Sequence, residues 1–267
     1  MKALTRSEGS TSLSQDTRSL ARAASAALER AAQGALKVAV RGALVGGSLA
    51  ERRLFWVQAA LGRNQLGMHD VTPQGDIGIG GVSEQLYSEG FLSAWHEILG
   101  RELGPRLPSV LYEVGFQGAT WEIRQAIDHG IWVPALLKPL VGRPEMLARA
   151  RSSRFFHALV RESLHIVFRM IMTEGGWGRV ELIDLTGRAG FAADDAPAAD
   201  GPDAVVEVAN TPEPRRLGQT GRPSCYLVTG IYAAYFATVF GTPARAVETR
   251  CRAAGDARCR FEIRFSA

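Results

Sequence analysis

The amino-acid sequence predicts an α+β fold, an antiparallel sheet covered by helices. Apolar residues recur with helical spacing between about residues 83 and 171. In the C-terminal third they instead alternate with polar residues in short segments, which is typical of strands. Because the helical segments come first and the strands follow, with one helix inserted among them, we expect the sheet to be antiparallel.

The chain is long enough for one large domain with an extension. It has 267 residues, of which 46% are hydrophobic and 22% are charged, and this composition supports a core of normal size. We expect residues 1–65 to form an N-terminal extension, partly disordered and then helical, and residues 66–267 to form the main domain. The alanine-rich residues 14–44 predict a helix that serves either as a peripheral helix on the domain or as an arm for dimerisation or a protein partner.

Charge, apolar segments and cysteine content indicate which partners and which cellular location to expect. The net charge is +4, but the 31 Lys and Arg are spread along the chain, so we expect no nucleic-acid partner. The N-terminus has no apolar stretch typical of a signal peptide, and no window approaches the roughly 18 apolar residues of a membrane span. Three cysteines without a secretion signal predict reduced thiols and a cytoplasmic location.

The first part of the main domain contains one predicted hairpin and three predicted helices. "MHDVTPQGDIGIGG" is typical of a hairpin that turns at Pro73-Gln74-Gly75. A helix follows over 83–103, and Gly104-Pro105 ends it. Its apolar residues share one side of the helix and are Leu86, Phe91, Trp95, Ile98 and Leu99. A second helix over 108–127 carries Gly115, Gly118 and Ala119, which permit close helix packing, and a third, long helix covers 144–172.

The second part predicts four strands and one apolar helix. The strands are expected in "RVELIDLTG", "VVEVANT", "ARAVETRC" and "RCRFEIRF". Between the second and third of these lies the apolar helix "SCYLVTGIYAAYFATVFG", with Ser224 as its N-cap and Gly241 at its end.

Two of the three cysteines lie symmetrically about a predicted turn. Cys251 and Cys259 are each four residues from Gly255, so a hairpin that turns there places them opposite each other. Cys259 alternates with arginines and shares its strand face with Phe261 and Ile263, so both thiols are expected to point inward. This spacing leaves three interpretations open: a disulfide, two inert core cysteines, or part of a metal site.

The third cysteine favours a metal. Cys225 lies at the predicted start of the apolar helix, where the helix dipole stabilises a thiolate. Thiolates suit Zn²⁺, which takes about four ligands, and Glu248 can supply the fourth. In a regular strand Glu248 and Cys251 point to opposite faces, so this site requires a bulge between them.

Several stretches give the chain a resemblance to the 4-vinyl-reductase domain family, which binds small molecules. They are "EGGWGRVEL", "CYLVTGIYAAYFATVFG" and "ARAVETRCRAAGDARCRFEI", within residues 145–266. Upstream, "FLSAWHEILGREL…VLYEVGFQGA" is similar to the sensor domains of bacterial aromatic-responsive transcription activators. The resemblance implies a fold like that of vesicle-tethering-complex subunits, a homodimer, and a structural zinc ion held by Cys225, Glu248, Cys251 and Cys259.

The sequence departs from the phenol sensors of that branch at their ligand-binding positions. "VELIDLTG" has no histidine and "VVEVANT" has no tryptophan where those sensors are expected to carry them. Aliphatic and aromatic side chains on two predicted helices could instead line an apolar pocket or fill the core. These candidate pocket residues are Phe156, Leu159, Val160, Phe168, Tyr226, Tyr232, Tyr235 and Phe236.

The leading functional hypothesis is a zinc-stabilised, dimeric regulator or carrier that binds an apolar small molecule. A four-ligand zinc site with no open position is structural, and no nucleophile or nicotinamide fingerprint is present in the sequence, so we do not expect an enzyme. Two alternatives remain: an enzyme or chaperone of tetrapyrrole metabolism, which the name of the family suggests, and a scaffold that binds protein partners without a ligand.

Overall fold

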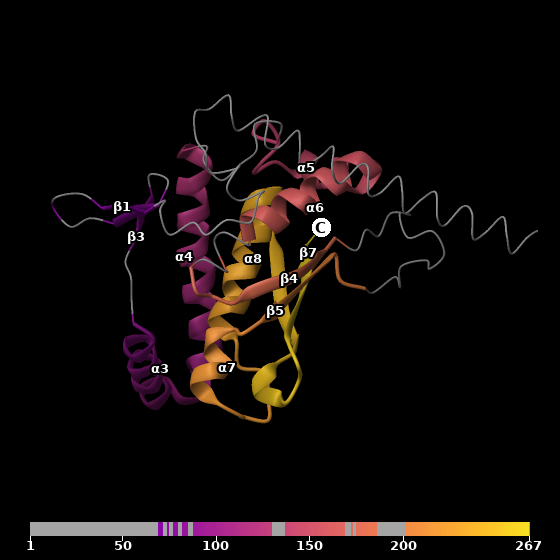
Figure 1. Ribbon diagram of the computed structural model, residues 1–267. Coiled ribbons are helices and arrows are strands. Elements are labelled where there is room, and N and C mark those ends of the chain that lie inside the picture. Colours follow the sequence, from indigo (N-terminus) through magenta and orange to yellow (C-terminus); the bar gives the residue numbers. More distant parts are fainter. Residues whose placement is uncertain are drawn as a thin grey trace, which may run out of the picture.

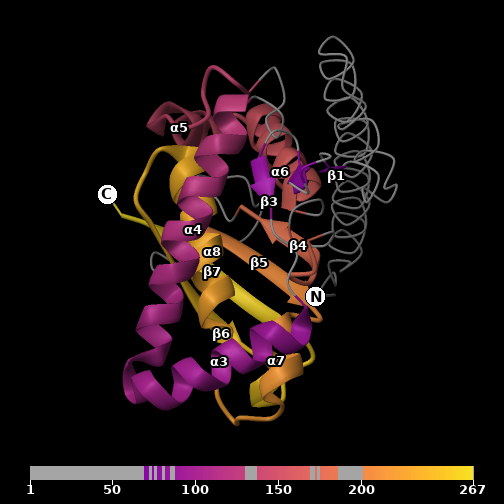
Figure 2. The ribbon, with the colours of Figure 1, turned by 90° about the vertical axis from the view of Figure 1, so that its left-hand side faces the viewer.

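The computed structural model describes residues 69–71, 74, 77–79, 82–84, 88–129, 137–168, 172, 175–185 and 201–266. Figures 1 and 2 show a sheet with helices stacked against one face, which confirms the predicted α+β architecture. The helix predicted for residues 14–44 lies outside the described residues. Among the described helices, none is both long and apolar enough to cross a membrane.

A small sheet precedes the helices. β1 (His69–Val71) and β2 (Ile77–Ile79) pair antiparallel on either side of Gln74, as the hairpin motif predicts. β3 (Val82–Glu84) adds a third antiparallel strand, so the helix predicted from residue 83 begins later, as α3 (Glu89–Leu103). Ser88 sets this start, because its Oγ accepts the backbone N–H of Phe91 at 3.1 Å.

Helix α3 ends where the sequence predicts, but it buries less than its apolar side suggests. Gly104 adopts a φ of 51°, and a 3₁₀ turn, η2 (Gly104–Arg106), leads into α4 (Leu107–His129). Phe91 and Ile98 are 55% and 49% exposed. The helix projects from the main body at the lower end of α4 (Figure 1), and part of its apolar side is exposed.

The long third helix predicted over 144–172 is two helices in the structure. α5 (Pro144–Ser152) and α6 (Arg154–Phe168) are separated by Ser153, whose φ of −132° and ψ of 120° are extended. The Ser153 Oγ accepts the backbone N–H of Phe156 at 3.3 Å, which begins a new helix. The prediction of one helix was wrong because the apolar spacing continues across a serine that favours a cap.

The main sheet has four antiparallel strands in the order β4-β5-β7-β6. They are β4 (Arg179–Asp184), β5 (Ala204–Ala209), β6 (Ala244–Arg250) and β7 (Cys259–Phe265). The inward face of β7 is Cys259, Phe261 and Ile263, all buried. The outward face carries ion pairs between neighbouring strands, as between Arg260 and Glu207 at 3.0 Å.

Helix α8 (Tyr226–Phe240) is the centre of the fold. It contacts β6 and β7 on one side and α4 on the other, so it lies between the sheet and α4 (Figure 1). Its residues are apolar all round, which is typical of a buried helix. It ends at Gly241 in the left-handed conformation, as predicted, whereas its N-cap is Cys225 and not Ser224.

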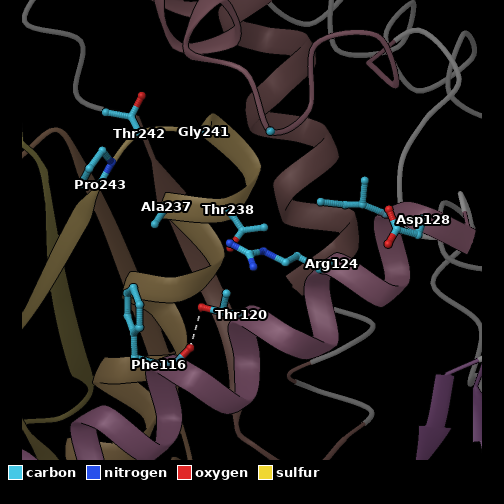
Figure 3. A pocket seen from close by; sticks show the side chains of 11 residues that line it. Phe116, Thr120, Arg124, Asp128, Ala237, Thr238, Gly241, Thr242 and Pro243 are labelled. Carbon is cyan, nitrogen blue, oxygen red and sulfur yellow. Dashed lines mark hydrogen bonds between the residues drawn. The ribbon is translucent and has the colours of Figure 1, made fainter.

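Glycines allow α4 and α8 to pack at very short range. A Cβ on Gly115 of α4 would lie 2.1 Å from the Leu227 carbonyl oxygen, and one on Gly230 of α8 would lie 2.0 Å from the Tyr112 carbonyl oxygen. Both contacts are to backbone, which cannot move aside as a side chain can. The small residues in the α4 sequence therefore mark the helix contact that the sequence predicts. Farther along the pair, the C-terminal ends of both helices line a surface pocket (Figure 3).

Candidate metal centre

All three cysteines and Glu248 meet at one point. Their ligand atoms, three Sγ and one carboxylate oxygen, lie within 4.8 Å of one another. The Cys225 Sγ is 3.6 Å from that of Cys259 and 3.9 Å from that of Cys251. All three thiols are free and fully buried, so the cluster is not a disulfide in this structure.

A bulge brings Glu248 and Cys251 to the same side of the hairpin. Glu248 faces Phe261 across the strands and Arg250 faces Arg260, so the register shifts by one residue between them. The extra residue lets Glu248 and Cys251 both turn inward. The tight turn predicted around Gly255 is a 3₁₀ turn, η4 (Arg252–Ala254), followed by Gly255 at a φ of 104°.

Backbone groups hold the ligand side chains in place. The N–H of Cys225 donates to Glu248 Oε2 at 2.9 Å, and the N–H of Cys251 donates to Asp256 Oδ2 at 2.8 Å. The nearby backbone N–H of Ser224 favours the thiolate form of Cys251, and that of Arg252 favours the thiolate form of Cys259, which is the form that a metal requires.

A bound cation would favour the charged forms of the side chains in this cluster. Hydrogen bonds from the other two thiols lower the pKa of Cys251, so it is the natural thiolate of the cluster. Burial raises the pKa of Cys225, and burial raises that of Glu248 to about 7. The Glu248 Oε1 is buried and has no hydrogen-bond partner within the described part of the chain.

The donor set and spacing match a tetrahedral thiolate site. A zinc ion with Zn–S distances of about 2.3 Å separates its sulfur ligands by about 3.8 Å, close to the separations of Cys225 Sγ from the other two sulfurs. The unpartnered Glu248 oxygen supplies a fourth donor. A metal ion therefore fits these four residues, and with all four in place the site has no open position.

The neighbouring arginines make other contacts. Arg258 lies 2.7 Å from Glu181 and Arg260 lies 3.0 Å from Glu207, on the outward face of the sheet. Arg252 donates to the Asn210 side chain at 2.8 Å. These three arginines therefore interact with acidic or amide side chains.

A buried carboxyl group that the sequence did not single out lies next to the centre. α7 (Pro212–Leu217), which was not predicted, carries Glu213, and this side chain is fully buried. Its carboxylate oxygens accept the N–H groups of Leu227 and Val228, at 2.9 and 3.5 Å, at the N-terminus of α8. Burial raises its pKa to about 8 despite these hydrogen bonds. The Pro-Glu-Pro sequence just after a strand is the signal that could have marked it.

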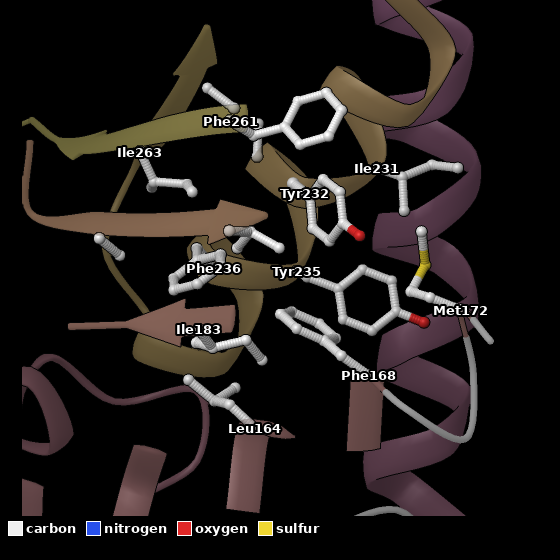
Figure 4. Close-up of a cluster of buried hydrophobic side chains, with 14 of the residues drawn as sticks. Leu164, Phe168, Met172, Ile183, Ile231, Tyr232, Tyr235, Phe236, Phe261 and Ile263 are labelled. Atoms are coloured by element: carbon white, nitrogen blue, oxygen red, sulfur yellow. The ribbon is translucent and has the colours of Figure 1, made fainter. Parts of the chain in front are cut away.

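The candidate pocket residues lie in and around the core beside α8 (Figure 4). The Phe168 ring makes edge contacts with Tyr232 and Tyr235, at centroid distances of 5.5 and 5.1 Å, and a tilted contact with Phe236. The structure buries six of the eight residues, and they are Leu159, Val160, Phe168, Tyr232, Tyr235 and Phe236. Phe156 and Tyr226 are partly buried and pack against this core. Burial raises the pKa of Tyr232 far above its usual range.

A tyrosine hydroxyl lies among these apolar side chains. The Tyr232 hydroxyl is buried, and it has no hydrogen-bond partner within the described residues. Figure 4 shows it directed toward the space between Tyr235 and Ile231, with Met172 nearby. A buried unpartnered hydroxyl is costly, so its position is of functional interest.

Comparison with known proteins agrees with the C-terminal motifs. Residues 204–265 match the model of the vinyl-4-reductase (V-4-R) domain, a segment that contains all four candidate metal ligands. This match confirms the resemblance to 4-vinyl-reductase domains over that segment. No curated protein matches the chain.

The solved structures that are similar to this chain include three that are described here. The phenol-responsive sensory domain of the transcription activator PoxR with phenol is 17% identical, with 74% of this chain and 84% of that chain covered and a TM-score of 0.48. A vinyl-4-reductase family protein from Methanocaldococcus jannaschii is 13% identical, covering 69% and 85%, with a TM-score of 0.38. A trafficking protein particle complex subunit 3 from Naegleria fowleri, covalently bound to palmitic acid, is 11% identical, covering 67% and 95%, with a TM-score of 0.37.

Proposed function

We propose that this chain is a regulatory or carrier protein that binds an apolar small molecule with one hydrogen-bonding group. The observation that carries this proposal is the Tyr232 hydroxyl, which is buried among aromatic rings without a partner in the described residues. Leaving a buried hydroxyl unsatisfied costs about 1–3 kcal/mol. A ligand with an apolar body and one polar atom would satisfy it, and the vinyl-4-reductase domain match of the surrounding segment is consistent with this role.

The proposal assigns zinc to the candidate centre as a structural ion. Cys225, Glu248, Cys251 and Cys259 would hold it. When bound, zinc supplies a cross-link between chain segments, and a closed four-ligand site offers no position for a substrate. Cys225 precedes the first residue of α8, so the cross-link would fix the helix that carries Tyr232. We therefore propose binding without catalysis, in a reducing cytoplasm where the thiols remain available.

Partners and domain organisation belong to the same proposal. We propose a homodimer, with residues 1–65 as an extension that is free to engage a protein partner and residues 66–267 as the ligand-binding domain. Exposed apolar side chains on α3 and α4 support association with another chain, since Phe91, Ile98, Val114 and Trp121 are each at least 41% exposed.

The same observations favour one alternative, a protein-interaction scaffold without a ligand. Under this alternative the rings around Phe168 are simply a filled core, and the apolar side chains on α3 and α4 are the functional surface. The two functions differ in whether Tyr232 contacts a ligand.

Native mass spectrometry of the purified full chain tests the proposal first. We expect one zinc ion per chain, two chains per particle and a co-purified organic molecule. A panel of substituted phenols and aromatic alcohols, added to solvent-extracted protein, tests binding directly by thermal shift.

Matched tyrosine variants make the test specific. Tyr232→Phe removes the unpartnered hydroxyl and should weaken binding of the phenols about tenfold. Tyr112→Phe is the control, because the Tyr112 hydroxyl already contacts the Ala246 N–H at 3.5 Å. Equal affinity of both variants and the parent, or no binding by the panel, favours the scaffold.

A further inference from the structure

A cavity on the surface lies at the opposite end of α8 from the metal centre. Its volume is about 510 Å³, and it lies between the C-terminal halves of α4 and α8 and the segments that follow α8 and precede α5 (Figure 3). Apolar side chains form much of its wall, and they are Phe116, Ile127, Ala237 and Pro243. Helix α8 spans about 20 Å, so this cavity is well separated from Cys225.

Two charged side chains line the cavity, and they are Arg124 and Asp128 of α4. Arg124 forms no ion pair or hydrogen bond within the described residues, although Asp128 lies one helical turn away. Figure 3 shows Arg124 extending from α4 toward α8, while Asp128 lies farther along α4. The Arg124 cation thus lines the cavity without an ion pair to Asp128.

A second donor lines the cavity from the facing helix. The hydroxyls of Thr120 and Thr242 donate to the carbonyl oxygens of Phe116 and Phe240, at 2.7 and 3.2 Å. The Thr238 hydroxyl makes no hydrogen bond within the described part of the chain, and Thr238 lines the cavity from α8. A planar anion can accept from both groups at once, as carboxylates do from arginine.

The geometry points to a binding site for a small amphipathic carboxylate. Its carboxylate accepts hydrogen bonds from Arg124 and Thr238, and its apolar or aromatic body lies along α4 toward Phe116. Arg124 and Phe116 are eight residues apart on one helix, about 12 Å, which accommodates a short aromatic or aliphatic acid. This site is independent of the ligand proposed for Tyr232.

Phenylbutyrate and its neutral amide are suitable probes for the full chain, measured by isothermal titration calorimetry. We expect the acid to bind about tenfold more tightly than the amide, because only the acid pairs with the guanidinium. Arg124→Gln should abolish that preference, and Thr238→Val should reduce it. Asp128→Asn should tighten binding of the acid, since it removes a like charge near the anion.

The controls separate this site from other effects. Arg101→Gln removes an exposed arginine of α3 that is paired with Glu102 and should leave binding unchanged. Tyr232→Phe should also leave it unchanged, so failure of the proposed function and failure of this site are distinguishable. Equal binding of acid and amide, undiminished binding to Arg124→Gln, or no binding of the acid at millimolar concentration would overturn the inference.

Discussion

At the scale of single residues, the candidate metal centre brings together buried donor atoms from three cysteines and one glutamate. The three sulfurs lie in a fully buried cluster, and the Glu248 Oε1 has no partner within the described residues. Serine keeps the size of cysteine but does not bind zinc as a thiolate does. We therefore expect substitutions of Cys225 and of its neighbour Ser224 to differ sharply in their effects on zinc binding and stability.

Cys225→Ser should remove the bound zinc and lower the free energy of unfolding by about 3–5 kcal/mol. Ser224→Ala is the matched control, since Ser224 is also buried and lies 3.8 Å from the Cys251 Sγ but is not a proposed ligand. It should keep the zinc and cost about 1 kcal/mol. Elemental analysis and chemical denaturation measure both. If the parent protein contains no metal and Cys225→Ser is as stable as the parent, the assignment of zinc to this site is wrong.

Glu213 predicts a pH dependence of stability. Its pKa is raised by burial to about 8 in the folded chain, above its usual value of 4.5, so folding favours the protonated form. Its contribution is fully present below about pH 4.5 and is lost as the pH rises through 8. Between about pH 5 and 8 the parent should lose about 3 kcal/mol through this group, and Glu213→Gln should not lose it. Chemical denaturation of the parent and the variant at the two pH values, with the zinc concentration held constant, tests this prediction. If the free energy of unfolding changes equally with pH in both proteins, the prediction is wrong.

At the scale of elements, the sequence identified most strands and helices because their periodicity is local. The bulge at Glu248 could also be anticipated, since a shared site requires it. The break at Ser153 and the short α7 were missed because they depend on caps and prolines within continuous patterns. The burial of α3 could not be read from its apolar side, since exposure depends on which other element covers it.

The contact between α4 and α8 gives a paired glycine test. Gly230→Ala places a Cβ 2.0 Å from the Tyr112 carbonyl oxygen and should cost more than about 3 kcal/mol as the helices separate. Gly118→Ala, on the open side of α4, meets nothing within 4 Å and should stabilise the chain by up to about 1 kcal/mol. Urea unfolding measures both; two changes of the same sign would exclude close packing as the cause.

At the scale of the whole molecule, the proposed zinc joins the start of α8 to the β6–β7 hairpin, across 34 residues of sequence from Cys225 to Cys259. The four proposed zinc ligands could be predicted from the sequence because their residue types and motif are specific. It could not supply the Tyr232 environment or the surface cavity, because both depend on how separate elements meet.

Removal of metal from the full chain should therefore loosen both the hairpin and α8. We expect a zinc chelator to lower the melting temperature by roughly 10 °C or more and to make all three thiols reactive toward a maleimide. Zinc added back should restore both properties. Full protection of the thiols after complete metal removal would show that packing alone holds the cluster.

The contact between α4 and α8 joins the segment that matches the family model to a helix outside that segment. The family match begins at residue 204, whereas α4, which buries one side of α8, ends 75 residues earlier at His129. The segment that matches the family model is thus shorter than the part of the chain that buries α8. A peptide of residues 204–267 would contain every proposed zinc ligand. Without α4, however, one side of the apolar helix α8 would be exposed to solvent. Such a fragment should aggregate in light scattering even when supplied with zinc.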